Sequence, residues 1–182
     1  GPATRIVAPA CSSRLSTKLG SSRHSPARQL LELSEKIVPI PGVGGIPPAD
    51  RIFAMLEQEF PVADVRRAVA AALRPKPNAG LGPHASLVDL SRGPDGVVRL
   101  VTTNFDRVFE QVDQTLAAIT PPELPDPARA GALRGIIHLH GKVSHDYTVQ
   151  EGPEFVLSSA DFGRAYLADG WATTFMRALM NR

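Results

Sequence analysis

The sequence predicts an α/β fold built around a mostly parallel sheet. Three observations point to this class. Segments with helical periodicity alternate with short apolar runs along the chain. The apolar runs at 97–103 and 135–139 are rich in β-branched residues, which favour strands. Each run is followed by polar side chains, as at the ligand-binding edge of open α/β sheets. A layered α/β domain is therefore expected.

Composition agrees with one globular domain, or with one domain and a fragment of another. The chain has 182 residues, of which 43% are hydrophobic and 21% charged, close to ordinary globular usage. No apolar run approaches the roughly 18 residues that a membrane-spanning helix needs. The single cysteine, Cys11, excludes a disulfide framework and a four-cysteine zinc site.

Residues 1–26 are predicted to be a disordered, basic, Ser-rich leader, and residues 27–182 to form the domain. Residues 1–28 carry five basic side chains and no acidic one, whereas the remainder carries fifteen basic and eighteen acidic residues. The folded part is therefore not expected to bind nucleic acid. Pro2, Pro9 and Pro26 interrupt any targeting helix, and no secretory signal is present. We therefore expect a cytoplasmic protein.

The first half of the domain is predicted to be helical. Prolines and glycines divide it, since Pro39 and Pro61 end helices and Pro47-Pro48 opens one. Residues 41–45 are expected to form a loop, and 75–80 a linker. The predicted helices span 27–38, 47–60, 62–73 and 83–91.

The second half is predicted to contain the sheet. A turn at 93–96 leads into a strand over 97–103, and a helix is expected over 106–119. A second strand covers 135–139, and Phe155–Leu157 reads as a third. Ser158 followed by Asp161 resembles a helix start with an acidic N3 residue, and a last amphipathic helix follows Gly170. Three strands are too few to complete such a sheet, so the sequence appears cut at both ends.

A glycine-rich stretch and a group of histidines carry weak signals. Gly42-Val43-Gly44 lacks the third glycine of a dinucleotide fingerprint, because Pro47 stands in its place, and a plain turn is favoured. His138 and His140 lie two apart on a predicted strand, so both are expected on one face. A metal site of the H-x-H-x-D-H type would need other residues where Lys142 and Val143 stand. No metal is therefore expected, although a metal hydrolase stays an alternative.

Polar residues at the ends of the first two strands are the best candidates for chemistry. Asn104 offers an amide that both donates and accepts hydrogen bonds. His140 offers a base whose ordinary pKa is near neutrality. Gly141 permits a close backbone approach or a turn. A structural capping role is an alternative for both strand ends.

Three segments in this order resemble the sirtuin-like family. They are LVTTNFDRVFE (100–110), IIHLHGKV (136–143) and FVLSSADFGRAY (155–166). The similarity extends from about Gly45 to the end of the chain. It is closest to a bacterial branch found in NAD-consuming antiphage defence proteins. The resemblance implies an incomplete Rossmann-like three-layer fold, with NAD as the ligand.

The resemblance also implies roles for individual residues. His140 matches the catalytic base, and Asn104 the residue that orients ribose or water. Thr103, Asp106 and Gly141 match the cofactor pocket, although Asp106 is equally suited to begin the next helix. Gly45 and Pro47 match the G-[LI]-P triplet that follows the family's phosphate-binding loop.

Departures from the family pattern leave several functions open. The first strand and its G-A-G-x-S loop are expected before Gly45, and a late strand after residue 182, but neither is recognisable. Zinc-binding cysteines of protein-deacylating members are absent, so NAD hydrolysis is favoured over deacylation. The alternatives are an NAD- or ADP-ribose-binding module, a scaffold for a partner, or a fragment that does not fold stably. A homo-oligomer or further domains are compatible with each of these readings.

Overall fold

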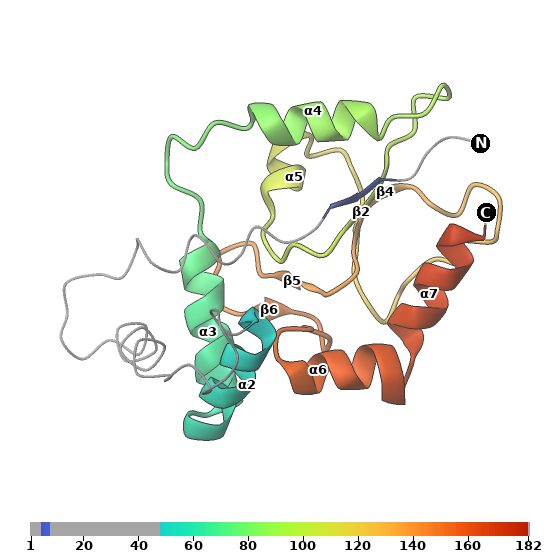
Figure 1. The fold of residues 1–182 in the computed structure, drawn as a ribbon. Helices are drawn as coiled ribbons and strands as arrows, with labels where there is room; N and C mark the ends of the chain where they lie inside the picture. The colour runs from blue at the N-terminus through green and yellow to red at the C-terminus, as the bar shows by residue number, and fades with distance from the viewer. Residues whose placement is uncertain (1–4, 8–47, 182) are drawn as a thin grey trace.

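The computed structural model describes residues 5–7 and 48–181 (Figure 1). These residues contain a four-stranded parallel sheet. The strands are β1 (Arg5–Val7), β2 (Arg99–Thr102), β3 (Ala118–Ile119) and β4 (Gly135–His138). Their order is β1-β2-β4-β3, and every neighbouring pair is parallel. The expected α/β class with a mostly parallel sheet is confirmed.

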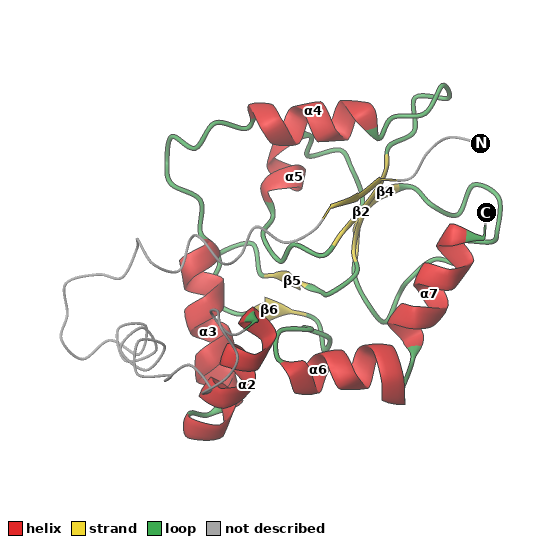
Figure 2. Cartoon of the chain, viewed as in Figure 1, coloured by secondary structure: helices red, strands yellow, loops and turns green. Residues whose placement is uncertain are grey.

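Helices cover both faces of this sheet (Figure 2). On one face, α4 (Gly82–Leu90) and α5 (Val108–Val112) pack through Val88 and Phe109 against Leu100 and Ile136. On the other face, α7 (Trp171–Met180) packs through Phe175. Successive residues of β2 and β4 therefore alternate between two apolar clusters, which explains why both strands are fully buried.

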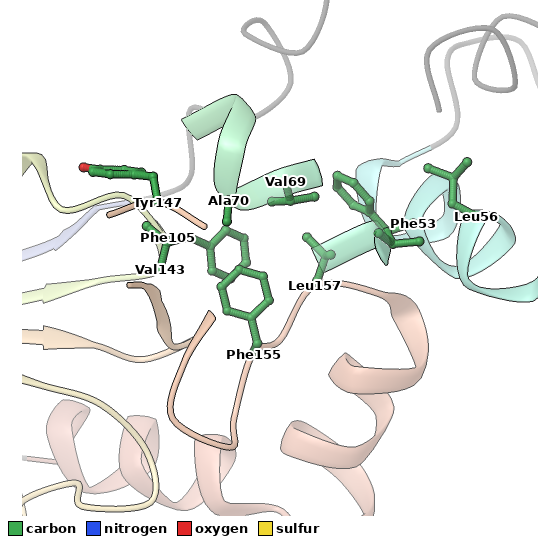
Figure 3. Packing of buried hydrophobic residues seen from close by; sticks show 10 residues of the cluster. Phe53, Leu56, Val69, Ala70, Phe105, Val143, Tyr147, Phe155 and Leu157 are labelled. Atoms are coloured by element: carbon green, nitrogen blue, oxygen red, sulfur yellow. The ribbon is translucent and has the colours of Figure 1, made fainter. Parts of the chain in front are cut away.

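A third apolar cluster joins the helical first half of the domain to the edge of the sheet (Figure 3). The helices α2 (Ala49–Glu59) and α3 (Val62–Leu73) contribute Phe53 and Val69. They pack on Phe105 and Phe155, whose rings lie 4.5 Å apart. The antiparallel pair β5 (Lys142–Val143) and β6 (Gln150–Glu151) borders the same cluster. These contacts place α2 and α3 beside the carboxyl end of β2.

A capped helical segment completes the described chain. Ser158 caps α6 (Ser159–Gly163) by accepting a hydrogen bond from the Asp161 backbone, and the Asp161 carboxylate accepts one in return, as the sequence predicts. The π-helical turn η2 (Arg164–Ala168) follows, and Gly170 begins α7 with a φ of 65°. The helix starts predicted near residues 48, 62, 83 and 158 are confirmed.

Two predicted elements in the second half are wrong. The predicted helix over 106–119 ends at Val112, because the Asp113 carboxylate accepts hydrogen bonds from the backbone and hydroxyl of Thr115 and closes a turn instead. Residues Ala118–Ile119 then pair with β4 as a strand. Phe155–Leu157 is buried without joining a sheet, so its apolar character reflects burial and not strand pairing.

The predicted disordered leader needs one correction. Residues Arg5–Val7 form β1, which pairs with the edge of β2 in the register Ile6↔Val101. Two β-branched residues, Ile6 and Val7, suit a strand that covers an otherwise unpaired edge. The rest of the leader, the predicted helix over 27–38 and the glycine-rich loop lie outside the described residues. Within the described part of the chain, no helix has the length and hydropathy needed to cross a bilayer.

Candidate functional site

The two polar segments of interest follow neighbouring parallel strands. In the pairing of β2 with β4, Thr102 lies opposite His138. Asn104 and His140 each lie two residues beyond this last pair, at the same carboxyl edge. Both side chains are largely buried, with Asn104 7% and His140 5% exposed. The structure therefore brings the two strand ends together, as the topology of a parallel sheet requires.

His140 lies in an aromatic environment. Its ring meets the edges or faces of Phe162 and Tyr166 in T-shaped contacts, with centroid distances of 5.0 and 5.7 Å. Its Nε2 atom lies 2.7 Å from the Tyr166 hydroxyl. Burial lowers the pKa of His140 to about 4. The imidazole is therefore neutral at pH 7, and the same burial makes it a weaker base than a free histidine.

Asn104 has an anchored backbone and an unpaired side-chain oxygen. Its backbone N–H donates to Thr102 Oγ1 at 3.0 Å, and its carbonyl accepts from His138 Nδ1 at 3.0 Å. The Oδ1 atom is buried and has no hydrogen-bond partner among the described residues. A buried acceptor without a donor costs roughly 1–3 kcal/mol. Such an atom is suited to accept a hydrogen bond from a bound water or hydroxyl.

The remaining residues of the two motifs have structural contacts of their own. Asp106 Oδ1 accepts a hydrogen bond from the Val108 backbone at 3.0 Å and closes a turn before α5, although Arg107 and not Asp106 is the N-cap residue of that helix. Gly141 has a φ of 84°, and a Cβ atom there would lie 2.1 Å from the Glu154 carbonyl oxygen. A tight turn against Glu154 therefore requires this glycine, whatever else it contacts. Thr103 is half-buried beside Asn104.

Gly45 and Pro47, expected to contact the cofactor, lie outside the described residues. Their predicted role stays a prediction. The described residues that matched the family pocket all come from the β2 and β4 ends.

His138 and His140 do not share one environment, contrary to the sequence expectation. The strand β4 ends at His138, and His140 lies in the turn that follows, where strand alternation no longer applies. His138 is fully buried, with Nε2 3.3 Å from Glu110 Oε2. His140 instead faces Tyr166. Among the described residues, no group of three or more His, Cys, Asp or Glu side chains could hold a metal ion.

Sequence reasoning missed the residues around these two histidines. Phe162 and Tyr166 are predicted on one side of the helix that starts after Ser158, and their rings are stacked 5.7 Å apart, but no sequence signal placed that side against His140. Glu110, Arg107 and Lys142 form a buried charged group beside His138. No sequence signal marked that group, because its members come from α5 and β5.

Two cavities lie near this edge of the sheet. A polar one of about 470 Å³ is lined by Arg107, Glu110, Gln111, Gln114, Leu116, Ala118, Lys142, His145 and Tyr147. An apolar groove of about 450 Å³ runs between the proline-rich loop after β3 and α7. Neither cavity is lined by Asn104 or His140.

Comparison with curated proteins finds a similar sequence. The chain is 37% identical over 125 residues to "Uncharacterized protein y4cA" of Sinorhizobium fredii. The match covers 64% of this chain and 10% of that protein, so the chain spans about a tenth of the length of its relative. No protein-family model matches the chain, and no solved structure matches it.

Proposed function

We propose that this chain is a sirtuin-like module that binds NAD and hydrolyses its nicotinamide–ribose bond. The observation that carries the proposal is that Asn104, whose buried Oδ1 atom is unpaired among the described residues, and the neutral His140 both follow the paired ends of β2 and β4. Both lie at the carboxyl edge of a parallel sheet, where such folds bind ligands. The sequence motifs that resemble the family supply the identity of the substrate.

The residues present suit this substrate. The ribose hydroxyls and the attacking water are hydrogen-bond donors, and Asn104 Oδ1 is a buried acceptor without a donor among the described residues. The strand β1 also supports the proposal, because it precedes Gly45 and pairs beside the strand that ends in Thr-Thr-Asn. A first strand before Gly45 is a feature that the family resemblance requires.

The proposed reaction displaces nicotinamide with water. The bond between the ribose C1′ atom and the nicotinamide nitrogen breaks, and its electron pair neutralises the pyridinium. Asn104 accepts a hydrogen bond from the water and orients it toward C1′, and the water oxygen forms the new bond. The water proton passes to the imidazole of His140. Excluding bulk water from this aromatic site strengthens the interactions with the positive charge that develops on the ribose.

A second candidate function is a module that binds NAD or ADP-ribose without cleaving it. One observation favours it, namely that Tyr166 already engages Nε2 of His140 at 2.7 Å. If the Tyr166 hydroxyl keeps its hydrogen bond to Nε2 of His140, that nitrogen is not available to take a proton from water. Saturable NAD binding without release of nicotinamide would decide for this alternative.

Protein deacylation is the less favoured activity, because the sequence has one cysteine and cannot form a cysteine zinc site. The relative is much longer than this chain, so the module would belong to a larger protein. A role of that protein in antiphage defence is a proposal that rests on the resemblance.

The test is nicotinamide release from NAD by the full chain and by two variants. His140→Ala and Asn104→Ala should each lower the rate by about 10²–10⁴-fold, the usual effect of losing such a group. His145→Ala and Asn78→Ala change exposed residues of the same types and serve as matched controls. Control variants should cleave NAD at the rate of the unaltered chain. Turnover at that rate in either site variant would contradict the assignment.

A further inference from the structure

His138 connects the backbone of Asn104 to a buried carboxylate. Its side chain is fully buried, with Nδ1 3.0 Å from the Asn104 carbonyl oxygen and Nε2 3.3 Å from Glu110 Oε2. The proposed reaction gives this histidine no chemical step. Its position nonetheless explains how Asn104 is held.

The carbonyl contact fixes a hydrogen on one nitrogen. A carbonyl oxygen only accepts hydrogen bonds, so Nδ1 of His138 must carry the hydrogen that joins it to Asn104. The opposite nitrogen, Nε2, lies 3.3 Å from Glu110 Oε2 and makes no hydrogen bond among the residues that the structure describes. A carboxylate also only accepts hydrogen bonds, so Glu110 attracts this side of the ring when Nε2 carries a hydrogen as well.

Glu110 is itself held by two cations. Arg107 Nε and Lys142 Nζ lie 3.5 and 3.8 Å from Glu110 Oε1. Lys142 also pairs with Glu151 on β6 at 3.1 Å, and Arg107 pairs with the same carboxylate. Burial raises the pKa of Glu110, but the contact with His138 and the charge of Arg107 outweigh burial, and the pKa is lowered. Glu110 therefore stays an anion beside the ring.

The backbone of Asn104 is then fixed on both sides while its side chain keeps a free acceptor. Its N–H is bound to Thr102 Oγ1, and its carbonyl to His138. The Oδ1 atom has no partner in the described part of the chain. The fixed backbone sets where the Asn104 side chain starts and its burial restricts the rotamers it can adopt, while Oδ1 stays available to a ligand.

We propose that His138 is a positioning residue that holds the carbonyl of Asn104 through its Nδ1–H group, with the Glu110 carboxylate on the opposite side of the ring. The effect of His138 on NAD cleavage rests on the proposed function, whereas the hydrogen bond from His138 Nδ1 to the Asn104 carbonyl does not. Loss of the bond releases the turn after β2 and lets the Asn104 amide move from the direction that the reaction needs.

The test compares two substitutions of similar size. His138→Asn places an amide N–H near the position of Nδ1, and His138→Leu removes the donor. In His138→Leu, the amide ¹⁵N shift of Phe105, whose peptide bond contains the Asn104 carbonyl, should move away from that of the unaltered chain, and kcat should fall about 10–100-fold with KM nearly unchanged. In His138→Asn, both the shift and most of kcat should be retained. An unmoved Phe105 shift in His138→Leu would overturn the proposal.

A second measurement detects the Nδ1 hydrogen directly in the unaltered chain. The imidazole ¹⁵N spectrum of the unaltered chain should show a protonated Nδ1 on His138, assigned by its loss in His138→Asn. A bare Nδ1 would overturn the proposal. A chain that shows the Nδ1–H bond but never cleaves NAD would support the positioning role and contradict the proposed function. Unchanged kcat in a folded His138→Leu variant would contradict the positioning role and leave the proposed function standing.

Discussion

The residues at the carboxyl edge of β2 and β4 combine burial with unused hydrogen-bonding capacity. Asn104 keeps a buried oxygen without a donor among the described residues, and His140 is buried in a form that carries no charge. The unpaired oxygen costs stability in the absence of a ligand, and the buried imidazole costs stability below about pH 6.5, where the unfolded histidine is protonated. Sites that tolerate such costs are often functional.

The pKa of His140 predicts a pH dependence of stability. An unfolded histidine binds a proton near pH 6.5, whereas the folded His140 does so only at about pH 4. Between these values the unfolded chain binds more protons, so the free energy of unfolding should fall as the pH is lowered. One pKa unit is worth about 1.4 kcal/mol, and the loss at pH 4 should reach about 3 kcal/mol. This contribution is fully present above pH 6.5.

Urea unfolding of the chain and of His140→Gln at a series of pH values measures this contribution. Glutamine does not titrate, so the slope between pH 6.5 and 4 should be smaller in the variant. Equal slopes in both proteins would show that His140 titrates normally in the folded chain.

Replacing Gly141 by alanine is predicted to lower the free energy of unfolding by a large amount. A Cβ atom there would lie 2.1 Å from the Glu154 carbonyl oxygen, and the φ of 84° is unfavourable for any other residue. Gly96 has a similar φ of 74° with nothing within 4 Å of the added atom, so Gly96→Ala is a matched control. Gly96→Ala should cost about 1–2 kcal/mol from the backbone conformation. Gly141→Ala should cost clearly more, as measured by chemical denaturation, and equal costs would contradict the close approach to Glu154.

At the scale of elements, the helix α6 depends on one carboxylate. Asp161 accepts hydrogen bonds from the backbone N–H groups of Leu157 and Ser158, both at 3.1 Å, and from Arg66 on α3 at 3.0 Å. It thus caps α6 and joins that helix to the helical first half of the domain. The aromatic side chains that contact His140 lie on the same segment, Phe162 in α6 and Tyr166 in η2.

Asp161→Ala is therefore expected to destabilise the fold by about 2–4 kcal/mol, since it removes a helix cap and leaves Arg66 without this partner. Asp64→Ala removes an exposed carboxylate that pairs with Arg67 within α3, and should cost less than about 1 kcal/mol. Thermal unfolding of both variants checks the difference. Similar losses in the two variants would mean that Asp161 does not join α6 to α3.

Local signals predicted some elements and failed for others. Prolines at 48 and 61 and the Ser158–Asp161 pair marked helix starts that the structure confirms, because such signals act within one turn of a helix. The strand at Ala118–Ile119 was not predictable, because two residues carry no periodicity and pair only once β4 is present. The charged group around Glu110 depends likewise on residues from separate elements.

At the scale of the whole molecule, the sheet needs cover on its edges and on its faces. The helices α4 and α5 cover one face, α7 covers the other, and β1 covers the edge of β2. The strand β1 lies far in the sequence from its partner β2. Its pairing ties the start of the chain to the strand that leads into Asn104.

Deletion of residues 1–7 should therefore loosen β2 in particular. Without β1, those β2 amides that face the lost strand would meet solvent, and their hydrogen-exchange protection should fall about tenfold or more. Amides in α3, which β1 does not pair with, should keep their protection and serve as the internal control. Unchanged protection throughout β2 would contradict the pairing of Arg5–Val7 with this strand.

The proposed site requires that NAD meets Asn104 and His140 together. The most direct measurement is an NMR titration of the chain with NAD, following the side-chain amide of Asn104 and the imidazole of His140. Both resonances should shift along one saturable binding curve, while free nicotinamide appears in the same sample. If the Asn104 and His140 resonances stay in place at saturating NAD, or if shifts are confined to residues lining the polar cavity beside Gln114, NAD does not bind at the proposed site.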